Sequence, residues 1–208
     1  MFAYCGNNPV VGYDPTGLIN WGGVAIGFGL AILTVVAVAT TIATAGAASP
    51  LLATTITTIG TATSVALGEA AFVTTVGAYT EAPVVYDVTV VGGHDRAGAS
   101  LVYDFGENTS EFYLHTGAQN KSDISVTVGS GFVLNYEEPG AYAGEFIDVN
   151  LSGEYKGASL GIDYCTSPEN FFNGYINSHA LLLTSGFSLS PYSSNKPTFS
   201  YDYYWMIS

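Results

Sequence analysis

The chain is poor in charged residues and has almost no basic ones. Asp, Glu, Lys and Arg make up 10% of its 208 residues, against about 25% in typical soluble domains. Four Lys and Arg stand against 17 Asp and Glu, which gives a formal net charge of −13. Because phosphate contacts require basic side chains, the composition argues against a nucleic-acid partner. It also argues against electrostatic adhesion to anionic lipid headgroups.

Cysteine is equally scarce. Cys5 and Cys165 lie far apart in the sequence, and two such residues provide neither a disulfide framework nor the spacing of a metal site. We therefore expect no disulfide, no metal and no other cofactor. Aromatic residues make up 13% of the chain, which excludes intrinsic disorder.

The few charges are unevenly distributed. No Asp, Glu, Lys or Arg occurs between Asp14 and Glu69. This gap divides the chain into a polar head over residues 1–18, a hydrophobic segment over residues 19–80 and a charged remainder over residues 82–208.

The hydrophobic segment predicts a helical hairpin. An apolar run over residues 20–48 begins near Trp21 and contains no charge, and about 20 apolar residues suffice to span a bilayer as a helix. The Ser-Pro pair at 49–50 predicts the turn. The second helix begins at Leu51 and is richer in Thr, and it carries Glu69 if it continues to Tyr79.

Small residues recur at every fourth position of the first predicted helix, at Gly23, Gly27 and Ala31. This spacing lets helices approach closely in lipid. We therefore expect the hairpin to insert into a membrane and to contain a transmembrane helix. A buried hairpin in a soluble α-domain and a β-prone Thr/Val segment are the alternatives.

From Pro83 onward the hydrophobic period changes to two, which is typical of β-strands. Strands are predicted over residues 84–91, 99–105, 111–115, 123–136, 147–155, 158–164, 180–189 and 198–207. Turns are predicted at residues 92–95, 106–108, 119–121, 138–140 and 156–157. The fold class is therefore α+β, with the helical hairpin followed by an antiparallel β-barrel or sandwich of about 7–8 strands.

Each of these strands has one apolar face and one polar face. Ile124, Val126 and Leu134 share a face, for example, whereas Asp123 and Ser125 lie opposite. Two arrangements fit this alternation: a soluble barrel with an apolar interior, or a lipid-facing one with a polar interior. We expect the first, because aromatic residues do not ring both ends of the strands.

The head carries a motif of turn-forming residues. Asn-Pro, Asp-Pro and a following Gly favour turns, and the matching positions are Tyr4, Asn7, Asn8, Pro9, Val10, Asp14, Pro15, Gly17 and Leu18. This pattern resembles the end of the RHS-repeat-associated core, which precedes the variable C-terminal toxin of RHS polymorphic toxins.

The resemblance implies an aspartyl self-cleavage site, with Asp14 as one catalytic acid and Leu18–Ile19 as the scissile bond. It also implies that the rest of the chain is the effector, that an immunity protein and the RHS shell of the parent chain are partners, and that the protein is secreted from a bacterium or membrane-associated.

Residues with catalytic potential are few. His94, Asp95 and Arg96 are consecutive in a Gly-flanked segment, where Arg could hold a phosphate, although a hydrophilic hairpin tip explains them as well. His179 precedes an apolar strand, and no G-x-S-x-G motif supports a triad around it.

The predicted function is insertion into, and permeabilisation of, the membrane of a rival bacterium, with the lipid bilayer as a further partner. The alternatives are a toxin enzyme in the β-domain, with residues 19–80 serving translocation, and a non-toxic surface or adhesion module.

Overall fold

The structure is a computed structural model that describes residues 50–136, 140–155, 157–168, 172, 178–188 and 197–207. The head motif with Asp14 and Leu18, and the first predicted helix with Trp21, Gly23, Gly27 and Ala31, lie outside the described residues. The described elements are α2 (Pro50–Thr80), β1 (Pro83–Asp104), β2 (Thr109–Leu134), β3 (Gly144–Tyr155), β4 (Ala158–Thr166), β5 (His179–Ser188) and β6 (Thr198–Ile207).

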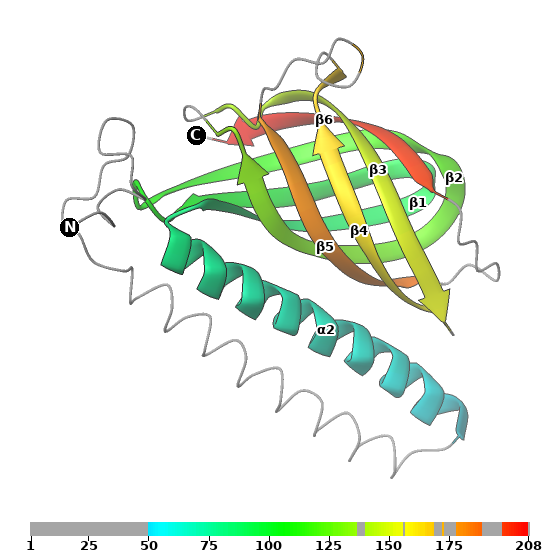
Figure 1. Cartoon of the computed structure of the whole chain (residues 1–208). Coiled ribbons are helices and arrows are strands. Elements are labelled where there is room, and N and C mark those ends of the chain that lie inside the picture. Colours follow the sequence, from blue (N-terminus) through cyan, green and yellow to red (C-terminus); the bar gives the residue numbers. More distant parts are fainter. Residues whose placement is uncertain are drawn as a thin grey trace.

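The six strands form one antiparallel sheet that closes on itself (Figure 1). One part of β2, Ser125 to Leu134, pairs with β5, and another, Phe112 to Gln119, pairs with β6. Strands β4 and β3 complete the ring between them. Five strands therefore make a barrel, and β1 is an extra strand that pairs with β2 alone among the described strands. The prediction of an α+β chain with an antiparallel barrel is confirmed.

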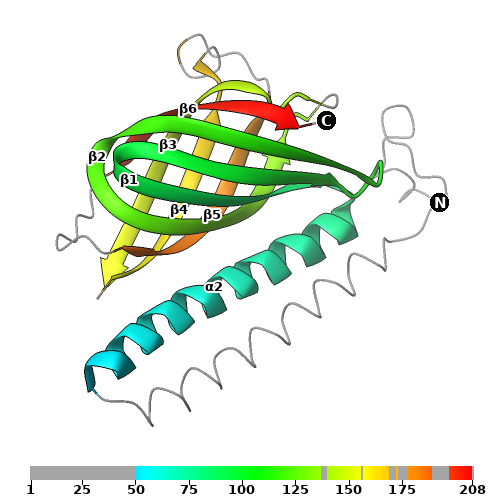
Figure 2. The ribbon, with the colours of Figure 1, turned by 180° about the vertical axis from the view of Figure 1, so that it is seen from behind.

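The predicted count of 7–8 strands is wrong, because β1 and β2 each join two predicted strands. The segments at 92–95 and 119–121, predicted as turns, lie opposite each other across the β1–β2 pair. The register shifts between Gly93 and Asp95, and His94 Nδ1 lies 3.1 Å from the Gln119 carbonyl oxygen. Both strands pass through this irregularity together, and both are long and curved (Figure 2). The turn-forming residues therefore produce a β-bulge instead of two reversals.

Two other predicted turns are present. The β1–β2 turn is held by Asp104, whose Oδ1 accepts hydrogen bonds from the backbone N–H of Gly106 and Glu107 at 2.8 and 3.2 Å. Gly157 has φ 85° between β3 and β4, a conformation that glycine adopts without steric cost.

Helix α2 packs against the outer side of the sheet. Pro50 is its first residue, a position where the missing N–H costs nothing. A small buried cluster joins its last turns to β1 through Val73, Ala78 and Val84. The hydroxyl groups of Thr74 and Tyr86 lie 2.5 Å apart and tie the same two elements together.

Of the predicted helical hairpin, the structure describes one helix, α2, because the first predicted helix lies outside the described residues. Over the part of the chain that the structure covers, no helix combines the length and the apolar character needed to cross a bilayer. The prediction of a transmembrane helix is therefore wrong for α2. Its 31 residues are sufficient in number, but frequent Thr and an internal Glu69 lower its mean hydropathy.

An aromatic cluster fills part of the barrel interior. Tyr142 packs edge to face against Tyr113 and Tyr204, at centroid distances of 5.7 and 5.2 Å. Phe146 adds a third contact at 4.9 Å. The rest of the interior is polar, and it contains the candidate site.

Candidate functional site

The two faces of the strands are arranged opposite to our expectation. On β3 and β4 the polar residues Asn150, Ser152 and Asp163 line an interior cavity. Their neighbours Leu151 and Ile162 point outward and are 58% and 48% exposed. Since successive side chains of a strand alternate between faces, the sheet encloses its polar face and exposes its apolar one.

Arg96 is the central residue of the interior. Its guanidinium Nη1 lies 3.0 Å from Asp202 Oδ2 and 3.3 Å from Asp148 Oδ2. All three side chains are buried, with Asp202 fully enclosed. Burial alone would lower the pKa of Arg96, but Asp148, Asp202 and Asp163 raise it above its usual value. Arg96 is therefore held in its charged form.

The contact from Arg96 to Asp202 depends on a glycine. Arg96 on β1 is paired with Gly117 on β2, and Gly117 is paired with Asp202 on β6. A Cβ at Gly117 would collide with Asp202 Oδ1 and with the Tyr201 carbonyl oxygen. The missing side chain thus lets the arginine reach across β2.

A second glycine makes room for His115. Gly98 on β1 is paired with His115 on β2, whose Nε2 occupies the space that a Cβ at Gly98 would need. The imidazole stacks on Tyr204 at a centroid distance of 4.5 Å, and its Nε2 lies 3.0 Å from Asp87 Oδ1.

Asp87 also accepts hydrogen bonds from two hydroxyl groups, Ser100 Oγ at 2.6 Å and Thr89 Oγ1 at 2.7 Å. Burial would raise the pKa of Asp87, but the hydrogen bond and charge of His115 and the two hydroxyls hold it below the usual value. The Ser100 hydroxyl is bound to the carboxylate and not to the imidazole, so this group lacks the order of a Ser-His-Asp triad.

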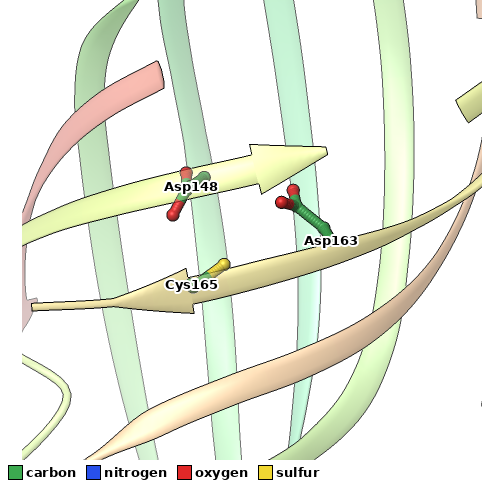
Figure 3. Close-up of side chains that lie close together, drawn as sticks. All are labelled: Asp148, Asp163 and Cys165. Carbon is green, nitrogen blue, oxygen red and sulfur yellow. The ribbon is translucent and has the colours of Figure 1, made fainter. Parts of the chain in front are cut away.

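A second set of ionisable groups lies on β3 and β4. Asp148 and Cys165 are directly paired, and Asp163 lies two residues before Cys165 on the same face. The three side chains point toward one another (Figure 3). Burial and the charge of Asp163 raise the pKa of Asp148 well above its usual value. Burial likewise raises the pKa of Asp163, to about 6, although Arg96 opposes the shift.

The candidates taken from the sequence lie in three different surroundings. Arg96 belongs to the buried interior. His94 and Asp95, at the bulge, are exposed. His179 begins β5 and makes an edge contact with Tyr164, at a centroid distance of 5.8 Å, on the face of the sheet opposite Asp163.

None of the site residues predicted from the sequence is Asp87, His115, Asp148, Asp163 or Asp202. A signal for them exists in the alternation, because four of the five are acids on the polar faces of predicted strands. Recognising it requires knowing that the polar face is enclosed.

Comparison of the chain with protein-family models, with curated proteins and with solved structures finds no match. The chemistry of the interior must therefore be inferred from its own geometry. Four buried or nearly buried acids share the interior with one arginine and one histidine. The cavity is also lined by Asp123, Glu154 and Lys121, so acids outnumber bases and the interior favours positive charge.

We predict that Arg96→Met strongly destabilises the fold. Removing one partner of a buried ion pair leaves uncompensated carboxylates and typically costs about 3–5 kcal/mol. Urea unfolding at neutral pH measures the loss, and Lys121→Met, which removes a cation that lines the same cavity but is partly exposed, is the matched control. An Arg96→Met loss no larger than that of Lys121→Met would show that Arg96 does not hold the interior together.

A second prediction concerns pH and Asp87. Since its pKa is lowered by folding, Asp87 stabilises the fold above its usual pKa, and this contribution is lost as the pH falls through the folded value. Asp87→Asn should cost about 1–3 kcal/mol at neutral pH, and the difference from wild type should shrink between about pH 5 and pH 3. Unfolding titrations across this range, with Asp95→Asn as an exposed control, measure it. A difference that stays constant with pH would contradict the assignment.

Proposed function

We propose that this chain is the C-terminal effector of an RHS polymorphic toxin and acts on the lipid bilayer of a rival bacterium. In this proposal the outward positions of β4, β5 and β6 contact the lipid tails, while Arg96 and the acids of the interior stay enclosed. The predicted transmembrane helix is not part of it.

The observation that carries the proposal is the apolar outer face. Leu160 and Ile162 on β4 are exposed, as are Leu181 on β5 and Tyr203 and Trp205 on β6. Soluble monomers rarely expose contiguous apolar surface of more than a few hundred Å². Large exposed apolar surfaces mark contacts with a membrane or with another protein.

Strand length and charge placement agree with lipid contact. Strands β3 to β6 contain 12, 9, 10 and 10 residues, close to the 9–11 residues with which a tilted strand crosses a hydrocarbon core. The acids of β4 and β6, Asp163 and Asp202, are buried in the interior. The outward positions of these two strands carry no charge.

The RHS assignment rests on the head motif, which ends at Leu18. On that basis an immunity protein and the RHS shell are the expected partners, and Asp14 is the proposed acid for cleavage after Leu18. An enclosing shell also has a physical purpose here, because the apolar outer face would otherwise aggregate before delivery.

We predict that the full chain floats with uncharged phosphatidylcholine vesicles and releases a trapped dye. Ile162→Lys should weaken vesicle binding at least tenfold, because a lysine on a lipid-facing strand position costs up to about 2–4 kcal/mol and about 1.4 kcal/mol corresponds to a factor of ten. Ile162→Lys should also relieve growth arrest when the chain is produced in bacteria.

Ser110→Lys is the matched control, because Ser110 is polar and exposed and lies beside the β1–β2 turn, at the end of its strand. Its vesicle binding should stay within about twofold of wild type. A lysine near the membrane surface costs only about 0–1 kcal/mol, far less than one at the centre of the bilayer. The proposal fails if wild-type protein remains in the aqueous fraction, or if both lysine variants bind equally well.

A further inference from the structure

The acids of the interior outnumber the bases that face them. Asp148, Asp163, Asp202 and Asp87 lie inside the barrel, and Arg96 is the only described cation in direct contact with two of them. Among these four acids, His115 contacts only Asp87, at 3.0 Å. The group around Asp148 and Asp163 therefore carries excess negative charge whenever both are ionised.

Three carboxylate oxygens of the interior acids have no hydrogen-bond or ion-pair partner within the described part of the chain. They are Oδ1 of Asp148, Oδ1 of Asp163 and Oδ1 of Asp202, and all are fully enclosed atoms. The other oxygen of Asp148 accounts for the contacts with Arg96 and with Ser200 Oγ, at 3.3 and 3.4 Å. Asp202 and Cys165 also contact the Asp148 carboxyl group. In addition to burial, the first contact helps to raise the pKa of Asp148 and the second that of the Cys165 thiol. A buried carboxylate oxygen without a partner is costly, so Oδ1 of Asp148 and Oδ1 of Asp163 favour a cation beside them.

Cys165 lies at the same point. Its Sγ, one carboxylate oxygen of Asp148 and one of Asp163 all lie within 4.8 Å of one another. Figure 3 shows the three side chains converging from β3 and β4. Zn²⁺ binds such ligands at about 2.0–2.3 Å, so ion binding requires the three side chains to close in on a common point.

We propose that Asp148, Asp163 and Cys165 form a binding site for a divalent transition-metal ion of the Zn²⁺ class inside the barrel. This inference does not depend on the proposed action on membranes, and it departs from our expectation of no metal. A thiolate with two carboxylates suits Zn²⁺ or Co²⁺, whereas Mg²⁺ and Ca²⁺ prefer ligand sets made of oxygen alone. Binding converts the Cys165 thiol to a thiolate and releases its proton to solvent.

The cavity provides an entrance for the ion. It is lined by the three proposed ligands and also by the partly buried Asp123, Glu154 and Lys121, so that acids outnumber bases along it. Negative charge along a cavity raises the local concentration of cations. Three protein ligands leave one position of a tetrahedral ion for water.

Co²⁺ is the probe that tests the site, because a cobalt–thiolate bond produces a near-ultraviolet charge-transfer band. We expect the full chain to develop this band with one equivalent of Co²⁺ and to lose it when Zn²⁺ is added. Cys165→Ser should abolish the band. Cys5→Ser, which changes the other cysteine of the chain, should leave it intact.

Asp163→Asn provides a second variant that keeps the thiol, and it should weaken Zn²⁺ binding at least tenfold in competition with Co²⁺. Circular dichroism confirms that each variant retains its strands. Absence of the band in folded wild-type protein would overturn the proposal. A band that survives Cys165→Ser but disappears in Cys5→Ser would overturn it as well. Vesicle binding is unaffected by either result, so this test is separate from that of the proposed function.

Discussion

The contacts of Arg96 determine which side of the sheet is enclosed. An arginine on β1 that must reach Asp202 on β6 and Asp148 on β3 can do so only through the interior of the closed sheet. The pairing of Arg96 with Gly117 and of Gly117 with Asp202 provides the path. Once these groups are inside, the strand alternation sends Leu151, Ile162 and the other apolar residues outward. The apolar outer face and the polar cavity are therefore two results of one constraint.

This arrangement divides the molecule into regions that are stabilised by different interactions. The aromatic cluster around Tyr142 fills part of the interior in the manner of an ordinary core. The polar part is stabilised by hydrogen bonds and ion pairs, whose energies change with pH and with bound cations. Helix α2 covers a portion of the outer face through Val73 and Thr74. The remaining apolar surface is what the proposed function assigns to lipid.

The strands were largely predictable, whereas their sidedness was not. Alternation located the β3 and β4 hairpin with its turn at Gly157, because that signal is local. The same local rules read the glycines and polar residues near Gly93 and Gln119 as turns, although the paired strands continue through both. A period of two shows that Ile162 and Asp163 face opposite ways but not which of them is inside. Contacts that span three strands, such as that of Arg96 with Asp202, cannot be predicted from the spacing of residues along the sequence. The candidate site was therefore recognised only from the fold.

The most direct test of the account is the sidedness of β6, where Ser200 is buried and the adjacent Tyr201 is exposed. Ser200→Cys and Tyr201→Cys, each made in a chain that also carries Cys5→Ser and Cys165→Ser, can be compared by their rate of reaction with N-ethylmaleimide in mild detergent micelles. This small reagent enters apolar as well as aqueous phases. The thiolate is the reacting species, so the rates are compared at a pH high enough to ionise a thiol that is not enclosed by the protein. The account predicts fast labelling of the cysteine at position 201 and slow labelling at position 200. The opposite order would mean that the apolar face is the interior, and it would contradict the account.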